Sequence, residues 1–156
     1  MNTQNKQTET KAANSISNIN LNSTSLQTAN AQDLIPIFES AKTLFEKNAE
    51  NIKLLDLSKT SGFADYFLIA SGRSAKQIQT MADFVVRKLK SLDIQNFSIE
   101  GTEACRWVLI DYGYFVVHLF QDELRDYYDL EGLWSHSPRV PLPKELFAPA
   151  ASPTLE

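Results

Sequence analysis

The residues best suited to bind a phosphate group are Ser71-Gly72-Arg73-Ser74, which follow a predicted strand and open a predicted helix. Backbone amides and the helix dipole can hold an anion at such a turn. Nucleotidyl transfer would also need closely spaced carboxylates on a neighbouring strand to bind a divalent metal. Asp56 and Asp111 are instead isolated acids at predicted strand ends. We therefore favour a structural turn with a helix cap and predict no catalytic residue, cofactor or metal.

Two other side chains could act as a base or a nucleophile. His118 lies in a predicted strand on the same face as Val116 and Phe120, and its local sequence offers no serine or cysteine partner. We predict a polar contact at an interface rather than acid-base chemistry. Cys105 is the single cysteine of the sequence, which excludes an internal disulfide and a zinc site built from cysteines.

A run of acidic and large apolar residues fills positions 122–134. Its carboxylates are Asp122, Glu123, Asp126, Asp129 and Glu131, and its apolar residues are Leu124, Tyr127, Tyr128, Leu130, Leu133 and Trp134. An acidic rim around apolar anchors is typical of a surface that binds a basic protein. The alternative is a short helix that closes the domain by packing its rings on a sheet. Because a helix this short can turn only one side inward, we expect some rings to face outward.

The overall composition predicts a single domain without a nucleic-acid backbone as its main partner. The chain has 156 residues, with 15 Lys plus Arg against 19 Asp plus Glu and a formal net charge of -4. This length is sufficient for one hydrophobic core. Phosphate binding needs a clustered excess of basic residues, which the sequence lacks. No apolar run approaches the roughly 20 residues that a membrane span requires.

The two ends of the chain differ in composition from its middle. Residues 1–30 are dominated by Asn, Thr, Ser and Gln, and are predicted to be a disordered polar tail, with an organelle-targeting segment as the alternative. Residues 143–156, rich in Pro and Ala, are predicted to be a second, flexible tail. The folded domain is then expected over residues 31–142.

Two amphipathic helices are predicted within that domain. The first has Asp33 as its N-cap and Pro36 in its first turn, and ends near Glu50. The second opens with a capping box made by Ser74 and Gln77. Its core-facing stripe consists of Ile78, Met81, Ala82, Val85, Leu89 and Leu92.

Apolar runs bounded by turn residues predict strands at 52–57, 64–70, 97–99, 106–112 and 114–120. The last two form an antiparallel hairpin around Gly113. The strand, turn, helix and strand that begin at residue 64 predict a right-handed crossover with neighbouring strands in parallel. The fold class is therefore α/β (α+β), a single compact domain with a mixed sheet of about five strands covered by helices. Trp107 opens one hairpin strand, and we favour an exposed anchor there because tryptophan is enriched in interface hot spots.

Several motifs, in order along the chain, resemble the ribosomal silencing factor (RsfS, Iojap) family. They are SGFADYFLIASG at 61–72, EG at 100–101, RWVLIDYG at 106–113, VVHLF at 116–120 and RDYYDLEGLW at 125–134. The resemblance extends from about Asp33 to Trp134, and both predicted tails fall outside it. It implies a nucleotidyltransferase-like topology without catalytic carboxylates.

The same resemblance implies a function. It implies a translation repressor that binds the large ribosomal subunit through ribosomal protein uL14, blocks association with the small subunit, and acts under nutrient limitation. It also implies a homodimer when free, no sequence-specific nucleic-acid contact, no membrane contact, and a bacterial cytoplasmic location, with an organelle matrix as the alternative. The competing functional hypothesis is a nucleotidyltransferase-like enzyme that binds nucleotide at the turn 71–74.

Carried over by position, the resemblance implies a set of partner-binding residues. They are Trp107, Asp111, His118, Asp126, Tyr127, Tyr128, Asp129 and Trp134.

Overall fold

The computed structural model describes residues 31–149. Its strands are β1 (Glu50–Asp56), β2 (Tyr66–Gly72), β3 (Ser98–Glu100), β4 (Trp107–Asp111), β5 (Phe115–Gln121) and β6 (Arg139–Val140). Its helices are α2 (Ala31–Glu46), α3 (Ala75–Ser91), α4 (Asp122–Tyr128), α5 (Leu130–Leu133) and the 3-10 helix η1 (Lys144–Phe147). No helix in this part of the chain has the length and apolar composition to cross a bilayer. The predicted tail at 1–30, and residues 150–156 of the predicted C-terminal tail, lie outside the described residues.

The sheet is mixed, as predicted, but its parallel pair is not the expected one. The six strands lie in the order β3-β4-β5-β2-β1-β6, and only the neighbours β2 and β5 are parallel. We expected the strand after α3 to lie beside β2, whereas β3 lies at the sheet edge and the β4–β5 hairpin leads the chain back to β2. Burial explains this order. All of β2 and all of β5 except Gln121 are buried, so these apolar strands take the centre, while β3 is mostly exposed.

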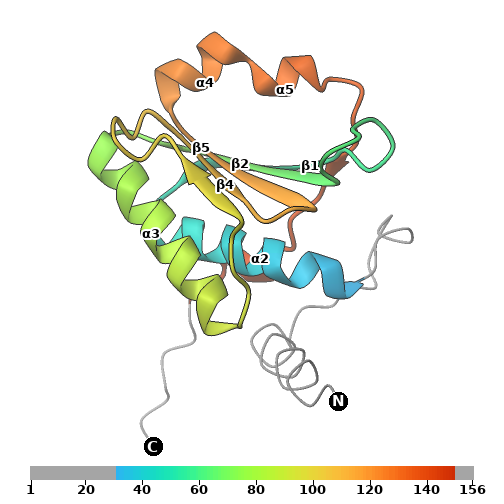
Figure 1. The fold of residues 1–156 in the computed structure, drawn as a ribbon, viewed down its shortest axis with the longest axis horizontal. Helices are drawn as coiled ribbons and strands as arrows, with labels where there is room; N and C mark the ends of the chain where they lie inside the picture. Colours follow the sequence, from blue (N-terminus) through green and yellow to red (C-terminus); the bar gives the residue numbers. More distant parts are fainter. Residues whose placement is uncertain (1–30, 150–156) are drawn as a thin grey trace, which may run out of the picture.

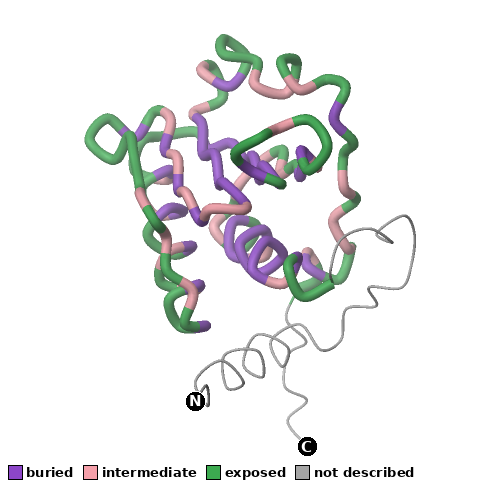
Figure 2. Tube along the Cα trace, turned by 45° about the vertical axis from the view of Figure 1, so that its right-hand side comes forward, coloured by how far each residue is buried: buried purple, intermediate pink, exposed green. Residues whose placement is uncertain are grey.

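Helices cover both faces of the sheet (Figure 1). The longer helices α2 and α3 pack on one face, over a core that includes Leu68 and Ala70 of β2. The short helices α4 and α5 lie across the other face, over a smaller core that includes Phe67 and Ile69 of the same strand. The tube drawing shows the buried positions concentrated in α2 and the central strands (Figure 2). The alternation of side chains along β2 thus supplies two separate cores.

The helix α3 begins as its sequence predicts. Ser74 is the N-cap, and its hydroxyl accepts a hydrogen bond from the Gln77 backbone N–H at 3.1 Å. Gln77 Oε1 accepts from the Arg73 N–H at 2.8 Å, one residue before the donor expected in a capping box. The predicted apolar stripe is buried from Ile78 to Leu92.

The predicted limits of the first helix are wrong. α2 already includes Ala31, so Asp33 lies in its first turn rather than at its N-cap. Pro36 is consequently one turn further in than predicted. The helix ends at Glu46 because Asn48 adopts a positive φ of 60°, and the chain then enters β1 at Glu50.

The folded domain also extends beyond the predicted boundary at residue 142. β6 pairs with the edge of β1, with Leu55 opposite Arg139, and accounts for the sixth strand. Further on, Leu146 is only 2% exposed and belongs to the larger core, while the ring of Phe147 meets Phe45 of α2 at 5.0 Å. We call residues 135–147 the C-terminal strap. Proline excluded a central strand here but left an edge strand and a 3-10 turn available.

Leu146→Ala is expected to lower the free energy of unfolding by about 2 to 4 kcal/mol, because the change removes buried apolar surface and leaves a cavity. Urea denaturation followed by circular dichroism measures this loss. The control is Glu145→Ala, an exposed change in the same turn of η1, expected to stay within about 0.5 kcal/mol of the wild type. Equal stability of the two variants would contradict the packing of η1 on the core.

Candidate functional site

The stretch 122–134 forms two short helices rather than the single one considered from the sequence. Asp129 separates them in the left-handed conformation, with φ of 43°. It is also the N-cap of α5, because its carboxylate Oδ1 accepts a hydrogen bond from the Gly132 N–H at 3.1 Å. A Cβ on Gly132 would lie 2.0 Å from Asp129 Oδ2, so only glycine leaves room for this cap. The break turns α5 along the sheet toward β1.

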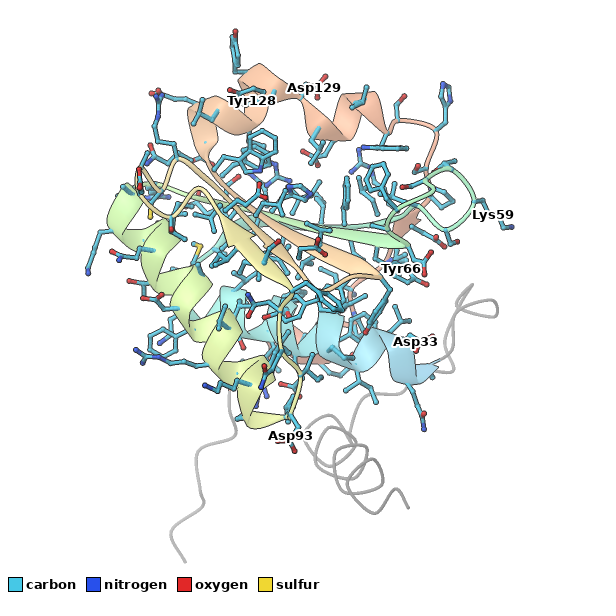
Figure 3. All side chains as sticks on the ribbon, viewed as in Figure 1. Asp33, Lys59, Tyr66, Asp93, Tyr128 and Asp129 are labelled. Carbon is cyan, nitrogen blue, oxygen red and sulfur yellow. The ribbon has the colours of Figure 1, made fainter. Side chains whose placement is uncertain are left out.

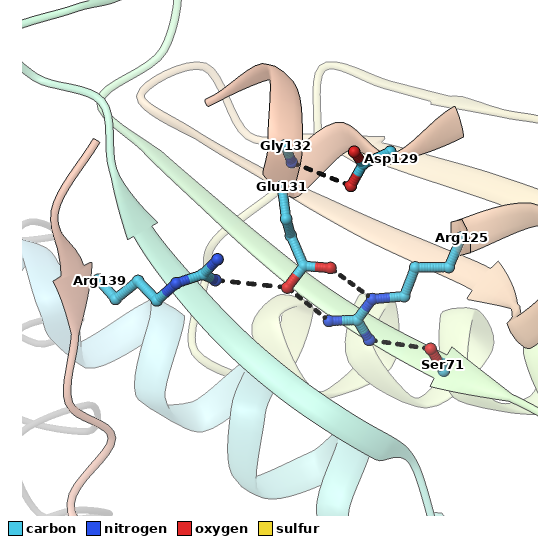
Figure 4. Close-up of polar contacts among 6 residues, drawn as sticks. All are labelled: Ser71, Arg125, Asp129, Glu131, Gly132 and Arg139. Carbon is cyan, nitrogen blue, oxygen red and sulfur yellow. Dashed lines mark hydrogen bonds and ion pairs between the residues drawn. The ribbon is translucent and has the colours of Figure 1, made fainter. Parts of the chain in front are cut away.

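A buried arginine fastens the two helices to the sheet (Figure 4). The Arg125 guanidinium donates to both carboxylate oxygens of Glu131, at 2.9 and 3.1 Å, and to the Ser71 hydroxyl at 2.8 Å. Arg139 of the strap donates to the same Glu131 at 3.4 Å. The hydrogen bond from Arg125 is the main cause that holds the pKa of the Glu131 carboxyl below its usual value, against the opposing effect of burial. Arg125 and Ser71 are both buried, so α4 has a fixed position on β2.

Several large side chains on these helices face solvent, as predicted. Tyr127 is 79% exposed and Tyr128 is 51% exposed, and Leu133 of α5 is also exposed. Figure 3 shows Tyr128 and Asp129 on the helical layer that lies on the far side of the sheet from Asp93. Asp126 is exposed on the same helix. The outer surface of α4 therefore combines two tyrosine rings with an acid.

Trp107 joins this surface from the neighbouring strand. Its indole stacks on Phe120 at a centroid distance of 4.8 Å, and the Tyr128 ring lies 4.9 Å from it on a tilted plane. Beside these rings is an open groove of about 620 Å³. Glu100, Gly101, Thr102, Glu103, Ala104, Arg106, Trp107, Leu124 and Tyr128 line it. The groove is thus apolar on the α4 side, and on the side of the 101–104 loop it carries two glutamates and Arg106.

Only some of the predicted partner-binding residues lie close together in the structure. Trp107, Asp126, Tyr127 and Tyr128 lie on or beside α4, and Asp129 follows them as the cap of α5. Trp134 lies further along this face and packs edge-on against Phe67 at 6.1 Å.

Asp111 is at the opposite end of β4 from Trp107, which pairs with Phe120 while Asp111 pairs with Val116. Its Oδ1 accepts from the Gly113 N–H at 2.7 Å, so it stabilises the hairpin turn. His118 is 3% exposed, which corrects the expectation that its side chain would itself meet a partner.

The sequence did not indicate the two glutamates that line the groove. Glu100 and Glu103 reach the groove because the loop between β3 and β4 turns sharply at Gly101. That glycine has φ of +81°, and a Cβ there would lie 2.0 Å from the Trp107 carbonyl oxygen. A glycine at this position indicates that another part of the chain passes close to its backbone, but the sequence does not show which part.

The turn 71–74 uses its polar groups within the chain. The Ser71 hydroxyl accepts from Arg125, and the Arg73 N–H donates to Gln77. The Arg73 side chain forms an ion pair with Glu50, and the Ser74 hydroxyl caps α3. This arrangement agrees with a structural turn that ends in a helix cap.

Comparison with known proteins gives a consistent family assignment. A family model described as ribosomal silencing factor during starvation matches residues 28–154. A ribosomal silencing factor from Bacillus subtilis is 43% identical over 97 residues, covering 62% of this chain and 82% of the relative. A mouse relative, mitochondrial assembly of ribosomal large subunit protein 1, is 34% identical over 95 residues, covering 59% of this chain and 42% of the relative. A crystal structure of a Chromobacterium violaceum protein, 31% identical, has a TM-score of 0.64 and covers 80% of this chain and 98% of that one.

Glu131→Gln is expected to lower the free energy of unfolding at pH 7 by about 1 to 3 kcal/mol, because Arg125 would remain buried without its counter-charge while the partial exposure of Glu131 limits the loss. Urea denaturation measures the change. Glu123→Gln, an exposed acid on α4, is the control and should be neutral within about 0.5 kcal/mol.

The stability difference between the wild type and Glu131→Gln is expected to depend on pH. Arg125 lowers the folded-state pKa of Glu131 below its usual value of 4.5. The stabilisation by this carboxylate is therefore fully present above pH 4.5 and is lost as pH falls through the folded-state pKa. As the pH falls below 4.5, the wild type should therefore begin to approach the stability of Glu131→Gln, and the difference should vanish below the folded-state pKa. A difference that stays constant down to pH 3 would argue against the ion pair.

Proposed function

The chain belongs to the ribosomal silencing factor family, and we propose from that membership that it binds the large ribosomal subunit through ribosomal protein uL14. Bound there, it blocks association with the small subunit and represses translation under nutrient limitation. The names of its relatives support a ribosomal partner, since they are silencing factors or a large-subunit assembly protein. The observation that carries the proposal is the exposed pair Tyr127 and Tyr128 beside Trp107.

The chemistry of this surface suits a basic protein. Proteins that bind ribosomal RNA need clustered Lys and Arg to neutralise phosphates, so they present positive charge. Asp126 on α4, with Glu100 and Glu103 across the groove, outnumbers the single cation Arg106 and attracts such a partner. The rings provide apolar area that is desolvated on contact. Steric obstruction of subunit joining requires only that the complex is long-lived. We therefore propose a binding protein without a catalytic step.

Of the residues implied by the resemblance, we propose Trp107, Asp126, Tyr127 and Tyr128 as the direct contacts. Asp129 contributes charge at the edge of this surface and shapes it by capping α5. Trp134 extends the surface toward Phe63, whose ring lies 6.5 Å away. His118 is buried beneath the contacts, whereas Asp111 stabilises the hairpin turn at the far end of β4.

We further propose that the free protein forms a homodimer through the same rings, because exposed aromatic patches tend to be covered by a partner. We propose the bacterial cytoplasm as its location, supported by the higher identity to the Bacillus subtilis relative than to the mitochondrial one. An organelle matrix stays the alternative, and expression of a fluorescent fusion in the source cells distinguishes the two.

Co-sedimentation with separated ribosomal subunits tests the contact surface. The protein should bind the large subunit and reduce the yield of joined ribosomes when the small subunit is added. Trp107→Ala and Tyr128→Ala should each weaken binding by at least tenfold, as expected for central aromatic anchors. Sedimentation velocity of the same variants without ribosomes should show less dimer.

Phe97→Ala is the matched control for Tyr127→Ala, because Phe97 is 80% exposed against 79% for Tyr127 but lies against Gly113, away from α4. Tyr127→Ala should reduce affinity, and Phe97→Ala should leave it unchanged. A wild-type protein that binds neither subunit at moderate salt would overturn the proposal. Heat on titration with a nucleoside triphosphate and Mg²⁺ would then favour an enzyme that uses the turn 71–74.

Charge is tested separately at the two aspartates. Asp126→Lys should weaken binding by roughly tenfold and make it less sensitive to salt, because it replaces an exposed negative charge with a positive one. Asp129 requires a milder change, since a lysine would also remove the cap of α5. Asp129→Asn keeps the capping oxygen and tolerates the left-handed conformation. Binding by Asp126→Lys at wild-type strength would exclude electrostatic attraction at this position.

A further inference from the structure

His118 is buried at the centre of the sheet face that α4 and α5 cover, yet only one of its nitrogens has a hydrogen-bond partner. Its Nδ1 accepts from the Trp107 indole Nε1–H at 3.1 Å. An accepting nitrogen carries no hydrogen, so the neutral ring bears its hydrogen on Nε2. That nitrogen is buried and has no hydrogen-bond partner among the described residues.

The surroundings of this ring are aromatic rather than polar. The centre of the Phe67 ring lies 4.5 Å from that of the imidazole, in an edge-on arrangement. The Phe120 ring is nearly parallel to the imidazole at a centroid distance of 6.2 Å. An N–H group among such rings gains only weak contacts. Burying a donor without an acceptor costs about 1 to 3 kcal/mol, so an apolar side chain would suit the core of this face better. The bond to Trp107 is the specific interaction that a histidine adds at this position.

That bond determines what Trp107 presents to the groove. Nε1 is the sole polar atom of an indole, and here it points toward the sheet. Trp107 stacks on Phe120 and contacts Tyr128, and these contacts fix the plane of the indole. The hydrogen bond to His118 then determines that the edge with Nε1 lies inward. The surface beside Tyr128 therefore contains only carbon from this side chain and leaves no donor for a partner to satisfy.

We infer that His118 is a positioning residue for the partner contact: it fixes the indole of Trp107 with its N–H inward, so that an apolar face is preformed for the bound protein. This inference rests on the proposed function, because it concerns the same surface. Preformed geometry favours affinity since the side chain loses less freedom on binding.

Burial of His118 supports this role over the working range of pH. It lowers the pKa of the imidazole to about 4, so the ring is neutral and Nδ1 can accept at the pH where ribosomes function.

Three variants separate positioning from packing. His118→Phe fills the space but removes the acceptor, and His118→Asn restores an acceptor near the position of Nδ1. Trp107→Phe removes the donor. Their affinities for purified large subunits are measured with the full chain, together with the ¹H–¹⁵N signal of the Trp107 indole, which Trp107→Phe identifies. Val85→Ala in α3, buried on the opposite face, controls for loss of stability.

His118→Phe is expected to weaken binding about fivefold to tenfold and to shift the indole signal, while His118→Asn stays within about twofold of the wild type. In the Trp107→Phe background, His118→Phe should add no further loss, because the donor is already absent. Val85→Ala should bind as the wild type does. If His118→Phe does not fold, His118→Leu serves the same comparison.

Wild-type affinity of folded His118→Phe, or additive losses in the double variant, would overturn the inference. If the wild type fails to bind the large subunit, the proposed function fails. The indole signal then decides the orientation of Trp107 independently, and an unshifted signal in His118→Phe overturns that part as well.

Discussion

The outer layer of this domain depends on the partly buried ion pair between Arg125 and Glu131. α4 and α5 contain 7 and 4 residues, lengths at which an isolated helix does not persist in water. Their position is therefore set by tertiary contacts: the guanidinium reaches Ser71 on β2 and also binds the carboxylate of the following helix. A charge pair at this location constrains geometry more than it adds stability, because the cost of desolvation offsets much of the attraction.

The surface above that ion pair combines exposed apolar side chains with acidic ones. Exposed tyrosines and leucine favour association, and the acids beside them favour solubility and discourage anionic partners. Such a surface needs a rigid support if its rings are to meet a partner without rearrangement. Here the support comes from below, where Phe120 stacks under Trp107 and the central strands β2 and β5 are buried on both faces.

Much of the fold was predictable because its strongest signals are local. The stripe of α3, its Ser74 cap and the hairpin around Gly113 each depend on residues close in sequence. The errors arose where distant segments decide the outcome. The place of β5 beside β2 depends on which strands can be buried on both faces. The break at Asp129 is the exception, because it depends on a cap that a glycine only three residues later permits.

The candidate site was only partly predictable for the same reason. The length of the helix alone predicted that some rings would face outward, and Tyr127 and Tyr128 are exposed. Which strand residues join them did not follow, since Asp111 and Trp107 have the same parity on β4 but lie at its two ends. Similarly, His118 shares a face with the half-buried Trp107 yet is itself covered. Side-chain direction is a property of the strand, whereas exposure depends on what packs above it.

The C-terminal strap has a consequence for how the domain unfolds. It pairs with β1 at the sheet edge, places Arg139 on Glu131 on one side of the sheet, and inserts Leu146 into the core on the other. A segment attached on both sides of the sheet cannot leave one side without disturbing the other. The two faces are therefore joined into a single cooperative unit, and slow amide exchange should extend across the sheet to its β1 edge instead of ending at the central strands.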